Sequence, residues 1–479
     1  MGKIRQKWKN TPISVKAATA YTISNILLKG LSFLTMPLFT SLLSKAQYGQ
    51  YTVYQSWSGI LTILLTLNLA YGSFSRAMVR FEEKRDGYIS SVQGICLALS
   101  VLFWMIYLPL RRILNQVFEL PTWMIGVMVL EILTHASVML WTGKKRFDFK
   151  YKSVVAVTLL ISFASPLIAF FLVMHSEEKG FARILGYAIP TLLVGSALFI
   201  SNLVKGKRLF DREFWKYALS FNVPLLFYYF SQTIFNQSDR IMISHICGQE
   251  KAAMYGVAYN LAMLMSFVLN AINNSYVPWF YGKLKDNKQQ ENRSVSSTIA
   301  LIMAFMILFI VWFAPEIVQV MTAANGYEEA VGVVAPVAIS LLLLFYSQLF
   351  INVEFFYERK SDLAIASIGA ALLNIILNAL LIPAFGFVAA GYTTLCSYFV
   401  FVGANYLAMR RILKQEKIAD DFYDYRVLLL ILVLFMTASF LGMALYSWLI
   451  PRIVITLAVL AVLIIKRKAL ISVVKKIRD

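Results

Sequence analysis

Long apolar runs recur along almost the whole chain, and they constrain its fold more than any other feature. Each run is near the 20 or so residues that an α-helix needs to cross the hydrocarbon core of a bilayer. Because backbone N–H and C=O groups in lipid must be satisfied within the protein, such runs fold as helices. The chain is 59% hydrophobic and only 15% charged, whereas about a quarter of the residues are charged in a typical soluble protein. The sequence therefore predicts an all-α integral membrane protein.

Fourteen transmembrane helices are predicted from these runs. They fall roughly at residues 15–43, 48–74, 88–110, 121–143, 153–175, 182–203, 218–246, 252–281, 296–318, 330–357, 362–384, 387–409, 426–447 and 449–466.

The basic residues are distributed unevenly between the loops. The net charge is +20, and most of the 45 Lys and Arg residues fall in the loops and ends that share one side when both termini are cytoplasmic. Short cytoplasmic loops carry an excess of Lys and Arg, so both termini are predicted to be cytoplasmic. Basic residues scattered over short loops do not form a groove for a phosphate backbone, and no nucleic-acid partner is predicted.

Two short motifs repeat at nearly the same offset. Tyr48-Gly49 after the first predicted span is echoed by Tyr255-Gly256 after the seventh, and Gly186-Tyr187 in the sixth by Gly391-Tyr392 in the twelfth. This pattern predicts two six-helix lobes related by a parallel pseudo-twofold repeat, with a substrate cavity between them. The predicted domains are an N-terminal lobe (residues 1–205), a C-terminal lobe (206–415), and two extra helices with a basic cytoplasmic tail (416–479).

Charged residues inside the predicted spans are the first candidate site residues, because a charge in a membrane needs a partner, a cavity or a function. Lys29 lies about halfway along the first span. It is interpreted as a cationic contact for a diphosphate or acidic sugar, or as an ion pair with Glu131. Arg240 and Asp239 lie nearer the outer end of the seventh span. Arginine suits phosphate because its planar fork can form two hydrogen bonds at once, and an outer gate or interlobe salt bridge is the alternative.

Polar residues in other spans extend this set. Glu131 and His135 are four residues apart on one helix face; the pattern favours an interhelical hydrogen bond over a proton-coupling site. Asn270, Asn273 and Asn274 share another face, which favours cavity lining over helix–helix contacts. The tenth span adds further gate or coupling candidates: Asn352, Glu354 and Glu358.

Residues 374–391 contain an N-x3-N-x4-P-x2-G pattern between the eleventh and twelfth predicted spans. Residues 239–243 are followed by Tyr255-Gly256, and residues 39–49 form the corresponding turn of the first half. These motifs resemble the span 11–12 hairpin, the span-seven signature and the first-half turn of the Wzx-type oligosaccharide flippases, within the multidrug/oligosaccharidyl-lipid/polysaccharide exporter superfamily. The resemblance implies alternating-access transfer of undecaprenyl-diphosphate-linked repeat units across the bacterial cytoplasmic membrane. The units would supply surface polysaccharide such as capsule or O-antigen, with a polymerase and other assembly proteins as partners.

Two relatives in that superfamily are alternatives. Cation-coupled multidrug exporters typically have twelve spans and an acidic residue in the first, whereas this chain has Lys29 and no acid there. Lipid II flippases share the fourteen spans and a cationic cavity, but their first lobe carries several intramembrane arginines. Lys29 is the basic residue found deep in the first lobe here.

A membrane enzyme such as a polymerase or acyltransferase is the alternative from another class. The predicted outer loops are short, and His135 lacks a neighbouring nucleophile, so a transporter without bond chemistry is predicted. The sequence contains no GxxxxGK[ST] loop for direct ATP hydrolysis, and Cys96, Cys247 and Cys396 show no metal-binding spacing. No cofactor is predicted, and coupling to a proton or sodium gradient is left open.

Overall fold

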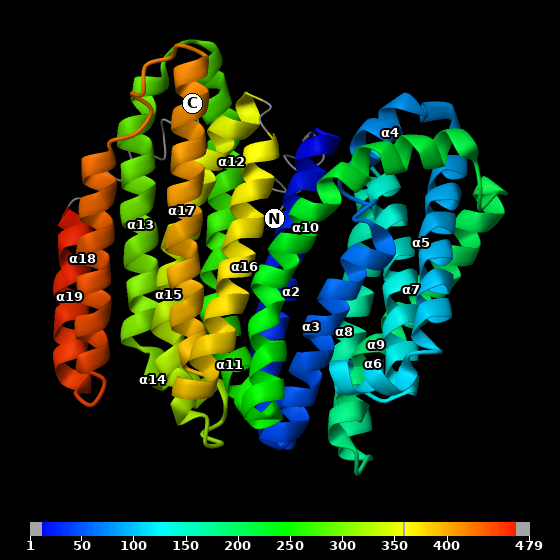
Figure 1. Cartoon of the computed structure of the whole chain (residues 1–479), viewed down its shortest axis with the longest axis horizontal. Helices are drawn as coiled ribbons and strands as arrows, with labels where there is room; N and C mark the ends of the chain where they lie inside the picture. Colours follow the sequence, from blue (N-terminus) through cyan, green and yellow to red (C-terminus); the bar gives the residue numbers. More distant parts are fainter. Residues whose placement is uncertain (1–11, 358–359, 466–479) are drawn as a thin grey trace, which may run out of the picture. The chain divides into compact units, whose positions relative to one another are not determined.

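The described chain is helical throughout. The computed structural model describes residues 12–357 and 360–465, and within them it leaves a few side chains, including that of Lys29, undescribed. These ranges contain helices, turns and linkers and no strand (Figure 1), which confirms the all-α prediction. The chain divides into two compact units, residues 1–241 and 242–479. The predicted boundaries at 205 and 415 stay predictions.

The first unit is built from nine α-helices and one short 3₁₀ helix in the described residues, the last α-helix running past its end. They are α2 (Ile13–Leu42), α3 (Lys45–Thr66), α4 (Phe74–Arg80), η1 (Glu82–Lys84), α5 (Arg85–Tyr107), α6 (Arg111–Phe118), α7 (Thr122–Phe147), α8 (Tyr151–Met174), α9 (Lys179–Gly206) and α10 (Arg212–Cys247).

The second unit contains nine further α-helices and two 3₁₀ helices in the described residues. They are α11 (Gln249–Ala262), α12 (Met265–Lys285), η2 (Gln289–Glu291), α13 (Asn292–Trp312), α14 (Ala314–Met321), η3 (Glu328–Ala330), α15 (Val331–Phe356), α16 (Lys360–Phe385), α17 (Ala389–Gln415), α18 (Tyr425–Ala444) and α19 (Leu449–Ile465).

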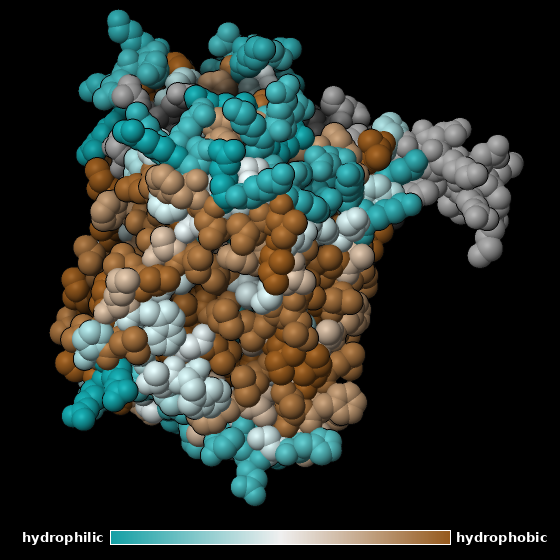
Figure 2. Space-filling model, turned by 90° about the vertical axis from the view of Figure 1, so that its right-hand side faces the viewer, coloured by the Kyte–Doolittle hydropathy of each residue, from teal (hydrophilic) through white to brown (hydrophobic). Residues whose placement is uncertain are grey.

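Nine helical segments in the described residues are long and apolar enough to cross a membrane, α11 and α12 counting as one. One face of the molecule shows an apolar band between two hydrophilic ends (Figure 2), as expected for a protein that sits in a bilayer. The protein is therefore a multi-pass membrane protein. The total of fourteen spans stays a prediction, because the segments at α2, α3, α10, α17 and α19 are not among the nine.

The first unit is held together by close helix contacts at glycines. A β-carbon on Gly195 of α9 would lie 2.6 Å from the carbonyl oxygen of Thr134 on α7. One on Gly186 would lie 2.2 Å from the Cα of Ala169 on α8. In lipid, where the hydrophobic effect does not drive helices together, small residues let backbones approach and gain van der Waals contact.

Polar caps set the start of two helices in this unit. Ser44 and Gln47 exchange hydrogen bonds as a capping box at the start of α3. Asp211 precedes α10 and accepts hydrogen bonds from the backbone N–H groups of Glu213 (3.0 Å) and Phe214 (3.2 Å). Partial burial opposes its ionisation, but these bonds and Arg208 hold the pKa of Asp211 below its usual value. The long helix that carries Arg240 therefore begins at a defined residue.

The second unit is organised around α15, the most buried of the candidate spans. Gly391 at the start of α17 lets that helix approach α15, because a β-carbon there would lie 3.0 Å from the Pro336 ring. Gly186 and Gly391, which the sequence pairs as a repeat, thus each lie at a tight contact within their own unit.

Candidate functional site: polar groups on the spanning helices

Glu131 of α7 is joined to α3 by a hydrogen bond. The hydroxyl of the buried Tyr54 donates to its Oε2 over 2.8 Å. A carboxylate inside a span is costly without such a partner. The predicted ion pair with Lys29 stays untested, because the side chain of Lys29 lies outside the described residues.

His135 lies one turn further along α7 and has an exposed side chain. It lines a pocket of about 130 Å³ within the first unit, between α3, α5, α7 and the turn after α3. Most of the lining is apolar, and its other polar side chains include those of Thr62, Thr66 and Asn68. Glu131 therefore lies in a hydrogen-bonded contact while His135 opens onto a small chamber.

Arg183 of α9 lies inside an aromatic cage that the sequence did not predict. Its guanidinium carbon is 3.8 Å from the ring centroid of Tyr51, 4.3 Å from that of Tyr48 and 4.6 Å from that of Phe39. Only 4% of the residue is exposed, and its Nε and Nη1 have no hydrogen-bond partner in the described structure. The spacing of Tyr48 and Tyr51, three apart on α3, was the available signal.

Arg240 and Asp239 are both buried near the end of the first unit. The Nη1 of Arg240 donates to Oε1 of Gln237 over 2.6 Å, one turn back on α10. Gln237 in turn packs on Gly59 of α3, where a β-carbon would come within 3.3 Å of its Nε2. A glycine on α3 thus makes room for the side chain that orients Arg240.

The three predicted asparagines of α12 differ in their surroundings. Asn273 donates from Nδ2 to Oε1 of Gln348 and so links α12 to α15. Asn270 and Asn274 have exposed side chains, although they lie within a candidate membrane span.

Asn352 and Glu354 lie near the end of α15 and are both buried. The Nδ2 of Asn352 has no hydrogen-bond partner among the described residues. Glu358 lies outside the described residues.

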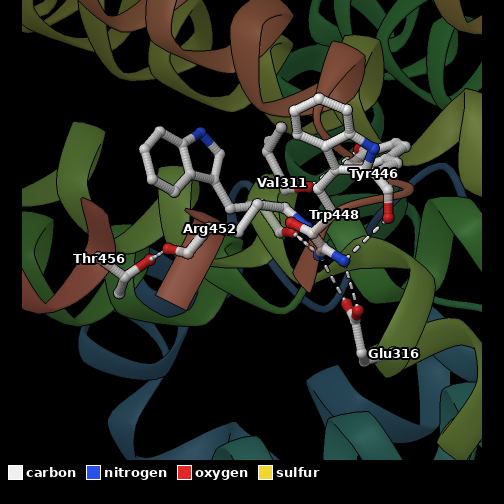
Figure 3. A network of polar contacts seen from close by, with 7 residues as sticks. Val311, Glu316, Tyr446, Trp448, Arg452 and Thr456 are labelled. Atoms are coloured by element: carbon white, nitrogen blue, oxygen red, sulfur yellow. Dashed lines mark hydrogen bonds and ion pairs between the residues drawn. The ribbon is translucent and has the colours of Figure 1, made fainter. Parts of the chain in front are cut away.

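A second arginine that the sequence did not single out, Arg452, is held at the start of α19 (Figure 3). Arg452 is 1% exposed, and its guanidinium donates two hydrogen bonds to the carboxylate of Glu316 on α14. Nη2 lies 2.6 Å from Oε1 and Nη1 lies 2.9 Å from Oε2. Arg452 also donates to the carbonyl oxygens of Trp312 (2.5 Å) and Tyr446 (3.0 Å). This network ties α19 to the rest of the second unit.

Two family descriptions match this chain. Residues 14–282 match the family described as polysaccharide biosynthesis protein, which is more than half of the chain. Residues 224–380 match the family described as MatE.

Relatives in Haemophilus influenzae are similar over parts of their length. A protein of the Lsg locus is 26% identical over 162 residues, which are 33% of this chain and 40% of that protein. An uncharacterized membrane protein is 24% identical over 291 residues, which are 57% of this chain and 66% of that protein. The matched regions thus leave a third or more of each relative uncovered.

Solved structures of two transporters share the fold. The lipid II flippase MurJ in its inward closed conformation aligns with a TM-score of 0.70 at 13% identity, over 94% of this chain and 99% of that chain. A multidrug resistance MATE family transporter in an inward-facing conformation aligns with a TM-score of 0.59 at 14% identity, over 84% and 99%. At these identities the likeness concerns the fold alone.

Proposed function

Since this chain belongs to the polysaccharide biosynthesis protein family, a group of transporters in the multidrug/oligosaccharidyl-lipid/polysaccharide exporter superfamily, we propose that it flips lipid-linked oligosaccharides. The substrate is an undecaprenyl-diphosphate-linked repeat unit, which moves from the inner to the outer leaflet of the bacterial cytoplasmic membrane. Both termini of the protein are cytoplasmic. A polymerase and other polysaccharide assembly proteins use the exported unit.

The observation that carries this proposal is the exposure of Asn270 and Asn274 within a spanning segment. Lipid tails cannot satisfy an amide, and each unsatisfied polar group in hydrocarbon costs on the order of a few kcal/mol. Two such groups on one helix face therefore favour a water-filled path, where they would form hydrogen bonds with sugar hydroxyls.

Two cations are proposed to contact the diphosphate. Arg240 presents a planar guanidinium held by Gln237, and such a fork pairs well with phosphate oxygens. Lys29 supplies a point charge on the first helix. The carboxylate of Asp239 is proposed to balance part of the positive charge of the neighbouring Arg240.

Net export requires an energy source, because a substrate shifts two conformations only by binding them differently. His135 is the coupling candidate in the first unit, and Glu131, one turn away on α7, is proposed as a residue of the substrate cavity. Asn352, Glu354 and Glu358 are proposed to act as gate residues at the end of α15.

The test uses a host strain that lacks its own copy of this protein. We expect that the wild-type chain restores surface polysaccharide, and that Lys29→Ala and Arg240→Ala abolish it while the protein remains in the membrane by immunoblot. Lipid-linked repeat units should accumulate in the mutant strains. Normal surface polysaccharide in both mutants would overturn the cation assignment.

The same strains distinguish the proposed function from its two alternatives, lipid II transport and small-molecule export. Loss of peptidoglycan incorporation without loss of surface polysaccharide would assign the chain to lipid II. A change only in drug susceptibility would assign it to small-molecule export.

A further inference from the structure

A groove of about 250 Å³ lies between α16 and α17 in the second unit. Small side chains form its floor: Ala366, Gly369 and Ala370 on α16 face Ala404 and Ala408 on α17. A β-carbon on Gly369 would meet no atom within 4 Å, so the space at this point is real and not filled by a neighbouring side chain.

The hairpin geometry explains the groove. Near their connecting turn the two helices are joined by Asn374, which donates to Thr394 Oγ1 (3.4 Å), and by Thr393, which donates to Asn378 Oδ1. Away from the turn, alanine and glycine replace these polar contacts, and the small side chains do not fill the space between the helices.

The edges of the groove are apolar and exposed. Ile365 is 69% exposed and Leu407 is 56% exposed. Both lie on helices of a membrane protein, so the surroundings that suit them are hydrocarbon chains. The groove is thus shaped and lined for an alkyl chain, whereas a sugar would leave its hydroxyls without partners there.

One end of the groove is cationic because Arg411 lines it. The preceding arginine, Arg410, is engaged by Asp420 (2.9 Å) and Tyr406 (3.0 Å). Within the described residues Arg411 has no such ion pair or hydrogen bond, and its side chain is exposed. An alkyl groove that ends at an arginine complements a lipid with a phosphate at its head.

We propose that this groove binds one acyl chain of an anionic glycerophospholipid, with the lipid phosphate on Arg411. Lys414 follows on the same helix, so this end of α17 is basic and favours an anionic headgroup over a zwitterionic one. The site lies wholly within the second unit and does not depend on the proposed transport substrate.

The test is native mass spectrometry of the full chain, purified with added phosphatidylglycerol or phosphatidylcholine. The wild-type protein should retain phosphatidylglycerol about fivefold more than phosphatidylcholine, the factor expected for one arginine near a phosphate. Arg411→Gln should remove this preference, whereas Lys414→Gln, a loss of the same charge beside the groove, should keep most of it. Gly369→Phe should fill the groove and displace either lipid.

Gly403→Phe is the matched control for the groove. A β-carbon at Gly403 also meets no atom within 4 Å, but the residue is not part of the groove lining. Equal lipid retention by Gly369→Phe and Gly403→Phe, or equal retention of the two lipids by the wild type, would overturn the proposal. Displacement of phosphatidylglycerol by equimolar undecaprenyl phosphate would overturn it as well and assign the groove to a polyprenyl chain.

Discussion

The hydroxyl of Tyr54 lies 2.8 Å from the carboxylate of Glu131 and connects α3 to α7 inside the first unit. The sequence favoured an interhelical hydrogen bond for Glu131 over a proton-coupling role. The Tyr54 hydroxyl is the donor of one such bond. This contact also leaves His135, one turn away, on the pocket side of α7.

A double-mutant cycle tests how much this contact contributes. We expect Tyr54→Phe and Glu131→Gln each to lower stability, and the pair to show a coupling energy of about 1 kcal/mol or more, because each change removes the same hydrogen bond. Unfolding in mixed detergent micelles measures it. Strictly additive effects would mean that the bond does not stabilise the unit.

Arg183 should be more sensitive to substitution than a surface arginine. Arg183→Met removes a desolvated cation from three aromatic faces, and we expect a loss of about 2 kcal/mol. Arg183→Lys keeps the charge but loses the planar stacking surface, so it should be intermediate. Arg111→Met, an exposed residue of α6, is the control and should be close to neutral. A neutral Arg183→Met would show that the cage is not a stabilising contact.

A bulkier residue at position 59 should disturb Arg240 without changing any charge. Gly59→Val would push on Gln237, the residue that holds the guanidinium. Surface polysaccharide should fall severalfold while the amount of protein in the membrane is unchanged. Gly282→Val, at a glycine of α12 where a β-carbon meets no atom within 4 Å, should leave export normal. Normal export in both variants would show that the position of Gln237 does not affect the function of Arg240.

The ion pair between Glu316 and Arg452 should make stability depend on pH. Hydrogen bonds from Arg452 hold the pKa of Glu316 below its usual 4.5. Because the folded pKa is the lower one, the stabilisation is present above about pH 4.5 and is lost as the pH falls through the folded value. The unfolding midpoint should drop as the pH falls below about 4.5, and Glu316→Gln should flatten this drop. Glu291→Gln, which breaks the surface pair with Lys283, should leave the drop in place.

Hydropathy predicted the helices well where a run of apolar residues ends at charges. The predicted span at 153–175 corresponds to α8, and the one at 218–246 lies within α10. The span predicted at 48–74 is longer than α3, which ends at Thr66 because Leu67 and Asn68 adopt positive φ angles of 47° and 52°. Asn68 is a residue type that tolerates positive φ, but Leu67 is not, so the local sequence signal for that turn was weak.

The sequence could not predict which residues contact the buried arginines. A lysine or arginine near the end of an apolar run looks the same whether it faces water or an aromatic cage, so neither Arg183 nor Arg452 was predicted as a buried contact. Their partners are far away in the sequence and become visible only when helices pack. Candidate residues in mid-span, such as Glu131 and Arg240, were recognisable because a charge there is costly wherever it points.

The paired hydrogen bonds between Arg452 and Glu316 join residues that are 136 positions apart, so a residue synthesised late contacts a helix synthesised much earlier. A nascent chain that has formed α13 and α14 holds the Glu316 carboxylate without its guanidinium until Arg452 at the start of α19 has been synthesised. A chain that stops short of Arg452 therefore keeps this acid without its partner in the first turn of α14. The stability of α14 thus depends on a residue that is added to the chain 136 positions later.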